Sequence, residues 1–220
     1  MDVGINSYAT VVVRDVKTGR IVYETTLSQR VHSLWNSVRA SEAQVHDLRR
    51  KAATLLHDRQ ARMAALDEAQ FHRKAASRKK RELAILAAQE IAYISHVWGN
   101  TVVAVEDLGW ISNTMQNGRW NRGALIQWLT HYVSQNGGWV VAVNSAHTSQ
   151  QCHVCGARVT HPTYKDSVCA EHGAMGRDVN AASNIAARAV PRVAKARATR
   201  AKTGKYSRSE HSKRPWPETR

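Results

Sequence analysis

The stretch TVVAVED, residues 101–107, decides the fold, because a short apolar run leads directly into two acids. An apolar run of this length without alternation predicts a strand that is covered on both faces, as in the middle of an α/β sheet. Residues 139–143 predict a further strand. The amphipathic pattern over residues 125–133 predicts a helix between the two, which Gly137-Gly138 ends.

The segments before this strand predict a hairpin and two long helices. Thr10–Arg14 and Arg20–Thr26 are β-branched runs separated by a polar loop with a late glycine, which is a hairpin signal. Residues 41–98 carry two apolar stripes at helical spacing. Between the stripes, residues 71–81 hold six Lys or Arg and no acid. We expect two antiparallel helices with a basic connection.

The segments after it predict a metal-binding insert and a last helix. The expected organisation is an α/β core with a mixed sheet at residues 1–147, with the helical insert at about 41–98, and a cysteine-containing insert at 148–176. An Ala-rich helix follows at 177–190, where Pro191 closes it. The remaining residues, 191–220, are rich in Lys and Arg and are expected to be disordered.

The composition of the chain limits which binding partners are expected. The chain has 220 residues and a formal net charge of +15, which favours a polyanion, with nucleic acid first. No apolar stretch approaches the roughly 18 residues of a membrane-spanning helix, so we expect no membrane partner. The N-terminus lacks the layout of a secretory signal, and three clustered cysteines fit metal binding in a reducing compartment. These features predict a cytoplasmic protein.

Three acids lie where strands end or a helix begins, namely Asp2, Glu106 and Asp178. Ligands gather at the strand ends of α/β sheets. Carboxylates from separate elements can hold two hard cations, as metal-dependent phosphodiester hydrolysis requires. Taken singly, an acid at such a position is usually a solvated cap. Asp107 points away from the face of Glu106 if the strand continues.

Paired cysteine spacing predicts a zinc site. Cys152-x-x-Cys155 is followed by Cys169-x-x-His172, and these two half-sites can close a tetrahedron around one Zn²⁺. A site with four protein ligands has no open position, so this zinc is expected to be structural. His153 and His161 are alternative fourth ligands.

Basic and aromatic residues offer candidate contacts to nucleic acid. The candidates for phosphate binding are Arg73, Lys74, Arg78, Lys79, Lys80, Arg81 and Arg177. Trp110 and Trp120 flank a Gly/Asn-rich loop and are candidates for base stacking, with packing as the alternative. A solvated helix face is the alternative for the basic run.

Four segments resemble, in order and spacing, the RuvC-like nuclease and zinc-finger half of TnpB. This is the transposon-encoded, OrfB-type family of RNA-guided nucleases, related to type V CRISPR effectors. The segments are DVGINSYAT at 2–10, VVAVEDLG at 102–109, TSQQCHVCG at 148–156 and GRDVNAASNIA at 176–186. The resemblance spans roughly residues 1–188, and the last two motifs together are specific.

The resemblance implies an RNase H-like fold and a DNA-cutting site in which Asp2, Glu106 and Asp178 bind Mg²⁺ or Mn²⁺. It also implies a DNA target, a target-nucleic-acid-binding role for residues 148–176 and a prokaryotic cytoplasm. The family has Cys where this chain has His172. It also has a large N-terminal region that helps to hold a guide RNA. We therefore expect a C-terminal fragment or a reduced relative, with guide RNA bound through the N-terminal region.

Two other functions remain open from the sequence. One is a cleavage-deficient effector or repressor of the same family, which binds DNA without cutting it. The other is a zinc-ribbon adaptor for nucleic acid, in which the α/β part is a scaffold.

Overall fold

The chain forms a mixed α/β structure, as the sequence predicts. The computed structural model describes residues 1–2, 8–99, 102–107, 121–144 and 146–203. Its helices are α1 (Gln29–Thr54), α2 (Arg59–Val97), α4 (Arg122–Gln135) and α5 (Arg177–Thr203). Its strands are β1 (Thr10–Arg14), β2 (Ile21–Thr26), β3 (Val102–Asp107), β4 (Trp139–Asn144), β5 (Asp166–Cys169) and β6 (Gly173–Gly176).

Residues 1–2 join two strand pairs into one strand order. β1 pairs antiparallel with β2, and β3 pairs parallel with β4. Between the pairs, Asp2 forms an antiparallel bridge with Thr10. The backbone nitrogen of Met1 donates a hydrogen bond of 3.0 Å to the carbonyl oxygen of Ala104. The strands thus lie in the order β2, β1, residues 1–2, β3, β4, as two separate two-stranded sheets with residues 1–2 between them.

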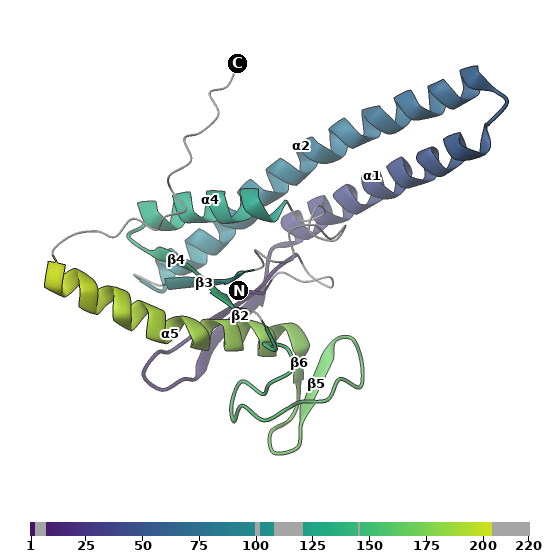
Figure 1. The fold of residues 1–220 in the computed structure, drawn as a ribbon. Coiled ribbons are helices and arrows are strands. Elements are labelled where there is room, and N and C mark those ends of the chain that lie inside the picture. Colours follow the sequence, from purple (N-terminus) through teal and green to yellow (C-terminus); the bar gives the residue numbers. More distant parts are fainter. Residues whose placement is uncertain (3–7, 100–101, 108–120, 145, 204–220) are drawn as a thin grey trace.

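Strand β3 is buried on both faces because its side chains alternate between two cores. Val103 and Val105 pack in a core with side chains from α1, α2 and α4. Ala104 packs on the other side, against Ile185 of α5. Figure 1 shows α2 and α4 on one side of these strands and α5 on the other. Because side chains two residues apart share a face, Glu106 lies on the side of α5.

Helices α1 and α2 form an antiparallel hairpin that projects from the rest of the molecule (Figure 1). The sequence predicts its start near residue 41, but α1 begins at Gln29. The hydroxyl of Ser28 caps this end by accepting a hydrogen bond of 3.4 Å from the backbone nitrogen of Val31. Val31 and Trp35, four residues apart, then begin the buried face of the helix.

The predicted basic connection is wrong, because residues 71–81 lie inside α2. Residues 55–58 join the helices, and the Asp58 carboxylate caps α2 by accepting a backbone hydrogen bond of 2.9 Å. Lys and Arg favour helix, and buried Ala69 and Ala76 continue the packed face of α2 through and beside the basic segment. Because these buried residues are alanines, the sequence shows no stripe of large apolar residues here that would predict a packed helix face.

Helix α5 also exceeds its predicted end, since it runs through Pro191 to Thr203. The expected disorder is therefore wrong for residues 191–203, and residues 204–220 lie outside the described part. Proline removes one helical hydrogen bond. The residues on either side of it are anchored, because Arg188 donates to backbone carbonyls at the end of β4 and just beyond it, both at 2.7 Å, and Arg192 donates to another carbonyl of β4.

Within the described residues, no helix combines the length and the apolar character that crossing a bilayer would need.

Candidate functional site

The three predicted acids come from three separate elements. Asp2 pairs with Thr10 through two backbone hydrogen bonds of 3.0 and 2.8 Å. Glu106 is the penultimate residue of β3, and Asp178 is the second residue of α5. All three are half-buried, whereas Asp107 is exposed.

The carboxyl groups of these acids act on one another. The side chains of Asp2 and Glu106 share a hydrogen bond, and Asp178 lies near enough to influence Asp2 by its charge. Burial raises the pKa of Asp2 most, and the charges of Glu106 and Asp178 add to it, giving about 7. Burial also raises the pKa of Glu106. Asp2 and Glu106 are buried carboxyls in contact, which need a shared proton or a cation. We call these two residues, together with Asp178, the acidic centre.

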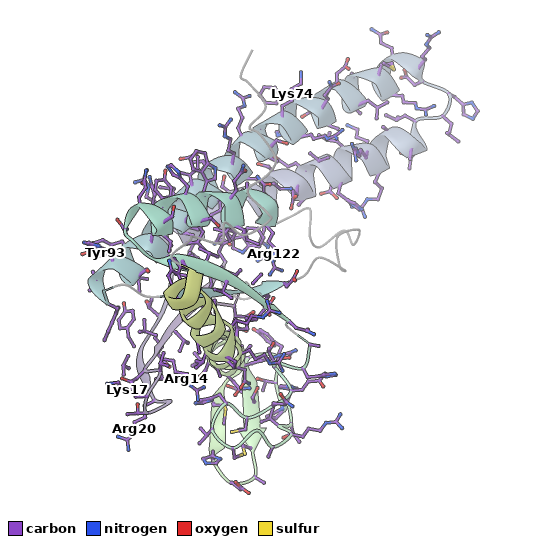
Figure 2. All side chains as sticks on the ribbon, turned by 60° about the vertical axis from the view of Figure 1, so that its left-hand side comes forward. Arg14, Lys17, Arg20, Lys74, Tyr93 and Arg122 are labelled. Carbon is purple, nitrogen blue, oxygen red and sulfur yellow. The ribbon has the colours of Figure 1, made fainter. Side chains whose placement is uncertain are left out.

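A cation that the sequence reasoning missed lies beside the acidic centre. Arg122 is the first residue of α4, and its Nη2 atom lies 3.7 Å from a carboxylate oxygen of Glu106. The same nitrogen donates a hydrogen bond to the carbonyl oxygen of Glu106. Figure 2 shows Arg122 where α4 meets the strands. Burial lowers the pKa of Arg122, and the charges of Glu106, Asp2 and Asp107 oppose this effect.

A surface depression of about 400 Å³ opens beside the third acid. Arg177 and Asp178 line it together with Thr10 and Lys165. The backbone nitrogen of Arg177 donates a hydrogen bond of 2.7 Å to the carbonyl oxygen of Lys165. The lining also includes Glu24, so the depression holds two cationic residues and two carboxylates.

A second centre is the cysteine cluster, Cys152, Cys155, Cys169 and His172. Its four ligand atoms all lie within 4.8 Å of one another, and in the described part of the chain it is the only group of three or more such residues gathered this closely. Cys169 ends β5, His172 lies in the turn between β5 and β6, and Cys152 and Cys155 lie in an earlier loop. Its location matches the two half-sites that the paired spacing predicts.

The spacing of the cluster fits zinc. The Sγ atoms of Cys155 and Cys169 are 3.7 Å apart, and Nδ1 of His172 lies 3.8 Å from Sγ of Cys152 and 3.7 Å from Sγ of Cys169. A tetrahedron with metal–sulfur bonds of about 2.3 Å has edges of about 3.8 Å. Hydrogen bonding with His172 and nearby backbone lowers the pKa of Cys169 to about 6, which favours the thiolate that metals bind.

The two alternative histidines have other contacts. Nδ1 of His161 lies 3.1 Å from the hydroxyl of Ser167. The backbone nitrogen of His153 donates a hydrogen bond of 2.8 Å to Oδ1 of Asn180, and the ring nitrogen Nδ1 lies 3.2 Å from the same oxygen. His172 is therefore the histidine that joins the cluster.

Polar side chains of α5 bind the segment around the cluster to the helix that carries Asp178. Asn180 is fully buried, and its Nδ2 donates a hydrogen bond of 2.8 Å to the carbonyl oxygen of Gln151. One turn later, Asn184 donates to the carbonyl oxygens of Thr148 and Gln151 at 2.8 and 2.7 Å. Both residues lie in the motif at 176–186, but nothing in their sequence pattern distinguishes them from exposed helical asparagines.

The predicted basic run divides into two groups. Nζ of Lys79 donates a hydrogen bond of 3.0 Å to Ser41, and Nζ of Lys80 lies 2.5 Å from Glu42, so both lysines hold α2 to α1. The other members, Arg73, Lys74, Arg78 and Arg81, are exposed. Figure 2 shows Lys74 on the projecting part of α2. Trp110 and Trp120 lie outside the described residues.

Comparison with known proteins adds a match to the second half of the chain. Residues 123–185 match the family model described as the Cas12f1-like TNB domain. This segment extends from α4 into α5 and contains the whole cysteine cluster. No curated protein matches the chain.

A solved structure is similar over most of the chain. It is the cryo-EM structure of the Cas12f1–sgRNA–target DNA complex, with a TM-score of 0.54 and 18% sequence identity. The match covers 80% of this chain and 49% of that chain. The present chain thus spans about half the length of the Cas12f1 protein that it resembles.

The fold and its two centres indicate the general class of the protein. It is a mixed α/β protein with an acidic centre and with a Cys₃His cluster between β4 and α5. The family model and the structural likeness are more specific. The chain is related to TnpB and the type V CRISPR effectors, and the family model covers the motif at 148–156 and nearly all of the motif at 176–186.

Proposed function

We propose that this chain is the metal-dependent DNA endonuclease part of an RNA-guided, TnpB-like nuclease, with Asp2, Glu106 and Asp178 as its catalytic, Mg²⁺-binding residues. The observation that carries this proposal is that Asp2 shares a hydrogen bond with Glu106 and also lies within electrostatic reach of Asp178. The strand order β2, β1, residues 1–2, β3, β4, with helices on both faces, supports an RNase H-like fold of the RuvC type.

The chemistry follows from the donor set. Carboxylate oxygens are the ligands that Mg²⁺ and Mn²⁺ prefer, and a bound pair of such ions supplies an activated water and charge neutralisation on the leaving oxygen. In hydrolysis, a water oxygen bonds to phosphorus, the P–O bond to the leaving sugar oxygen breaks, and that oxygen takes up a proton. Arg177 and Lys165, beside Asp178, would hold the scissile phosphate by charge. Glu106 would act from the end of β3, and Asp178 from the start of α5.

The proposed partners are a DNA target and a guide RNA. The Cas12f1 structure that this chain resembles is a complex with sgRNA and target DNA. The net charge of +15 and the exposed cations of α2 support binding of nucleic acid here. The guide RNA would be held largely by an N-terminal region of the kind that the family carries. Zinc in the cysteine cluster would be structural, because four protein ligands fill its coordination sphere.

The nuclease proposal is tested with purified, zinc-loaded chain, labelled single-stranded DNA and Mg²⁺. Glu106→Gln keeps the size of the side chain and removes its charge, so cleavage should fall by about 100-fold or more. Glu82→Gln, on an exposed position of α2, is the matched control and should cleave like the unchanged chain. Equal cleavage by Glu106→Gln and the unchanged chain would refute a catalytic role for the acidic centre.

Absence of cleavage in all three proteins, with DNA still bound, would favour the second function. The cysteine cluster is separate from the acidic centre and does not depend on its activity. A chain that binds DNA through zinc-loaded β5, β6 and their turns would then act as a cleavage-deficient effector or as a zinc-ribbon adaptor.

The division of the basic run gives a test of nucleic-acid binding. Replacing Arg73, Lys74 and Arg78 together by glutamine should reduce the slope of log affinity against log salt by about 3 for duplex DNA, because each phosphate contact contributes about 0.9. Lys79→Gln is the matched control, since Lys79 is committed to Ser41, and its slope should not change. An unchanged slope in the triple variant would assign these cations to a solvated face.

A further inference from the structure

Arg122 makes two contacts with a single residue of the acidic centre. Its Nη2 atom reaches both the carboxylate and the backbone carbonyl of Glu106. The side chains of Arg122 and Glu106 are only 14% and 12% exposed. A guanidinium that bridges the main chain and the side chain of one residue restricts where that carboxylate can lie.

The base of this guanidinium is also fixed. Arg122 begins α4, whose Leu125, Leu129 and Val133 are fully buried in the core that contains Val105 of β3. The helix that carries Arg122 and the strand that carries Glu106 are therefore packed in one core. The arginine is part of a rigid support and not a mobile surface cation.

The charge of Arg122 matters to any ion that enters. Arginine stays protonated in proteins. Its guanidinium also lies within electrostatic reach of Asp2. It therefore offsets part of the negative charge of the acidic centre at all times, and a divalent cation that binds the same carboxylates must do so against its repulsion.

We propose that Arg122 is the counter-charge and positioning residue of the acidic centre: it holds Glu106 in place without a divalent ion and weakens the first ion's binding in return. This inference rests on the proposed function, because it takes the acidic centre to be a cation site. Arg122 has two separable roles. Its charge lowers cation affinity, and the two contacts of its Nη2 atom place Glu106.

Two substitutions separate the roles. Arg122→Gln removes the charge and shortens the side chain, and Arg122→Lys keeps the charge but replaces the planar guanidinium whose Nη2 atom contacts Glu106. The charge role predicts that Arg122→Gln binds Mn²⁺ more tightly by about tenfold, which is the scale of one nearby charge even with water-like screening. Arg122→Lys should bind Mn²⁺ like the unchanged chain. The positioning role predicts slower cleavage by both variants at saturating Mn²⁺.

The experiment is a calorimetric titration of zinc-loaded full chain with Mn²⁺ alone, followed by single-turnover cleavage of labelled DNA. A disturbed fold would weaken ion binding, so tighter binding by Arg122→Gln is a readout that structural damage does not produce. Arg122→Met is a second neutral variant with the same expectation if Arg122→Gln does not fold. Mn²⁺ affinity in the folded neutral variants that is equal to or below that of the unchanged chain would overturn the inference.

The same titration keeps the two proposals apart. If Glu106→Gln and the unchanged chain bind Mn²⁺ equally, the acidic centre is not a cation site, and the proposed function fails together with the role of Arg122. If Glu106→Gln loses binding while the neutral variants at position 122 do not gain it, only the inference on Arg122 fails.

Discussion

The cysteine cluster and the acidic centre are built in opposite ways. The cluster has its ligand atoms at the spacing of a zinc tetrahedron, but little core lies beneath it: Cys152, Val159 and Cys169 are its buried apolar group, with Met175 packed against them. The acids of the acidic centre lie on elements that are held by the two larger cores, one on each side of β3. Its cost is electrostatic, since burial and neighbouring charge raise the pKa of Asp2 to about 7.

This difference indicates how far the folding of each region depends on its ion. At the cluster, a metal replaces the core that residues 152–173 lack, so binding and local folding are coupled. At the acidic centre, the main core holds carboxylates in an unfavourable arrangement, and a cation relieves the repulsion without being needed for the fold. Loss of zinc and loss of Mg²⁺ should therefore have very different structural effects.

Removal of zinc should have the largest effect. Structural zinc contributes about 10 kcal/mol or more to the folding of small metal-dependent units. Zinc-free protein should lose hydrogen-exchange protection across residues 152–173, while β3 and α4 stay protected. His172→Gln should weaken zinc retention strongly, and His161→Gln, which changes a histidine outside the cluster, should not. Unaltered protection in zinc-free protein would remove the contrast between the two centres.

Charge in the acidic centre should have the next largest effect. The folded pKa of Asp2, about 7, exceeds its ordinary value of 3.8, so the folded state holds the proton more firmly than the unfolded state. Stability without Mg²⁺ should therefore fall as pH rises from about 4 to about 7. Besides Glu106 and Asp178, Arg122 and the amino group of Met1 act on this carboxyl by charge.

Asp2→Asn removes this penalty. The free energy of unfolding of zinc-loaded, Mg²⁺-free protein should rise by about 2–4 kcal/mol near pH 8, and by less near pH 5. Urea denaturation at the two pH values measures the difference. A variant that is less stable than the unchanged chain at the higher pH would show that the carboxylates are not crowded.

The link between the centres gives the third prediction. Asn180→Ala leaves the backbone nitrogen of His153 without its partner and removes one donor to Gln151 in a fully buried place, at a cost of about 1–3 kcal/mol. Asn184→Ala, which removes hydrogen bonds to two carbonyl oxygens in a less buried place, should cost less. Thermal unfolding with zinc present measures both. Equal and small effects would mean that the cluster and α5 are held together by other contacts.

Features with a local signal were predictable from the sequence. The apolar run of β3 and the two half-sites of the cysteine cluster each depend on residues within a few positions of one another. The grouping of Asp2, Glu106 and Asp178 depended on the resemblance to TnpB, because no local pattern relates acids so far apart in the chain.

Features that depend on tertiary packing were missed. Arg122 reaches Glu106 across 16 residues, and only the packing of α4 against β3 brings them together. From the sequence alone, Asn180 is expected on the surface, and only its hydrogen bonds in the folded chain show that it is buried. The helical hairpin was misplaced for a related reason, since its alanines are buried by the close approach of two helices and not by their own size. Pro191 predicts the end of a helix, although the side chains of Arg188 and Arg192 anchor the helix on both sides of it.

Helix α2 sets a fixed distance between its outer cations and the core beside β3. It runs without interruption from the exposed Arg78 to Ile91, which is buried beside β3, and these 13 intervening steps span about 20 Å at 1.5 Å per residue. Any strand of nucleic acid that lies along the outer cations is thereby held at a set distance from the carboxylates. One inserted residue in this interval would rotate the cations by about 100° around the helix axis. Seven inserted residues would restore their direction but lengthen the distance from Arg78 to Ile91 by about 10 Å.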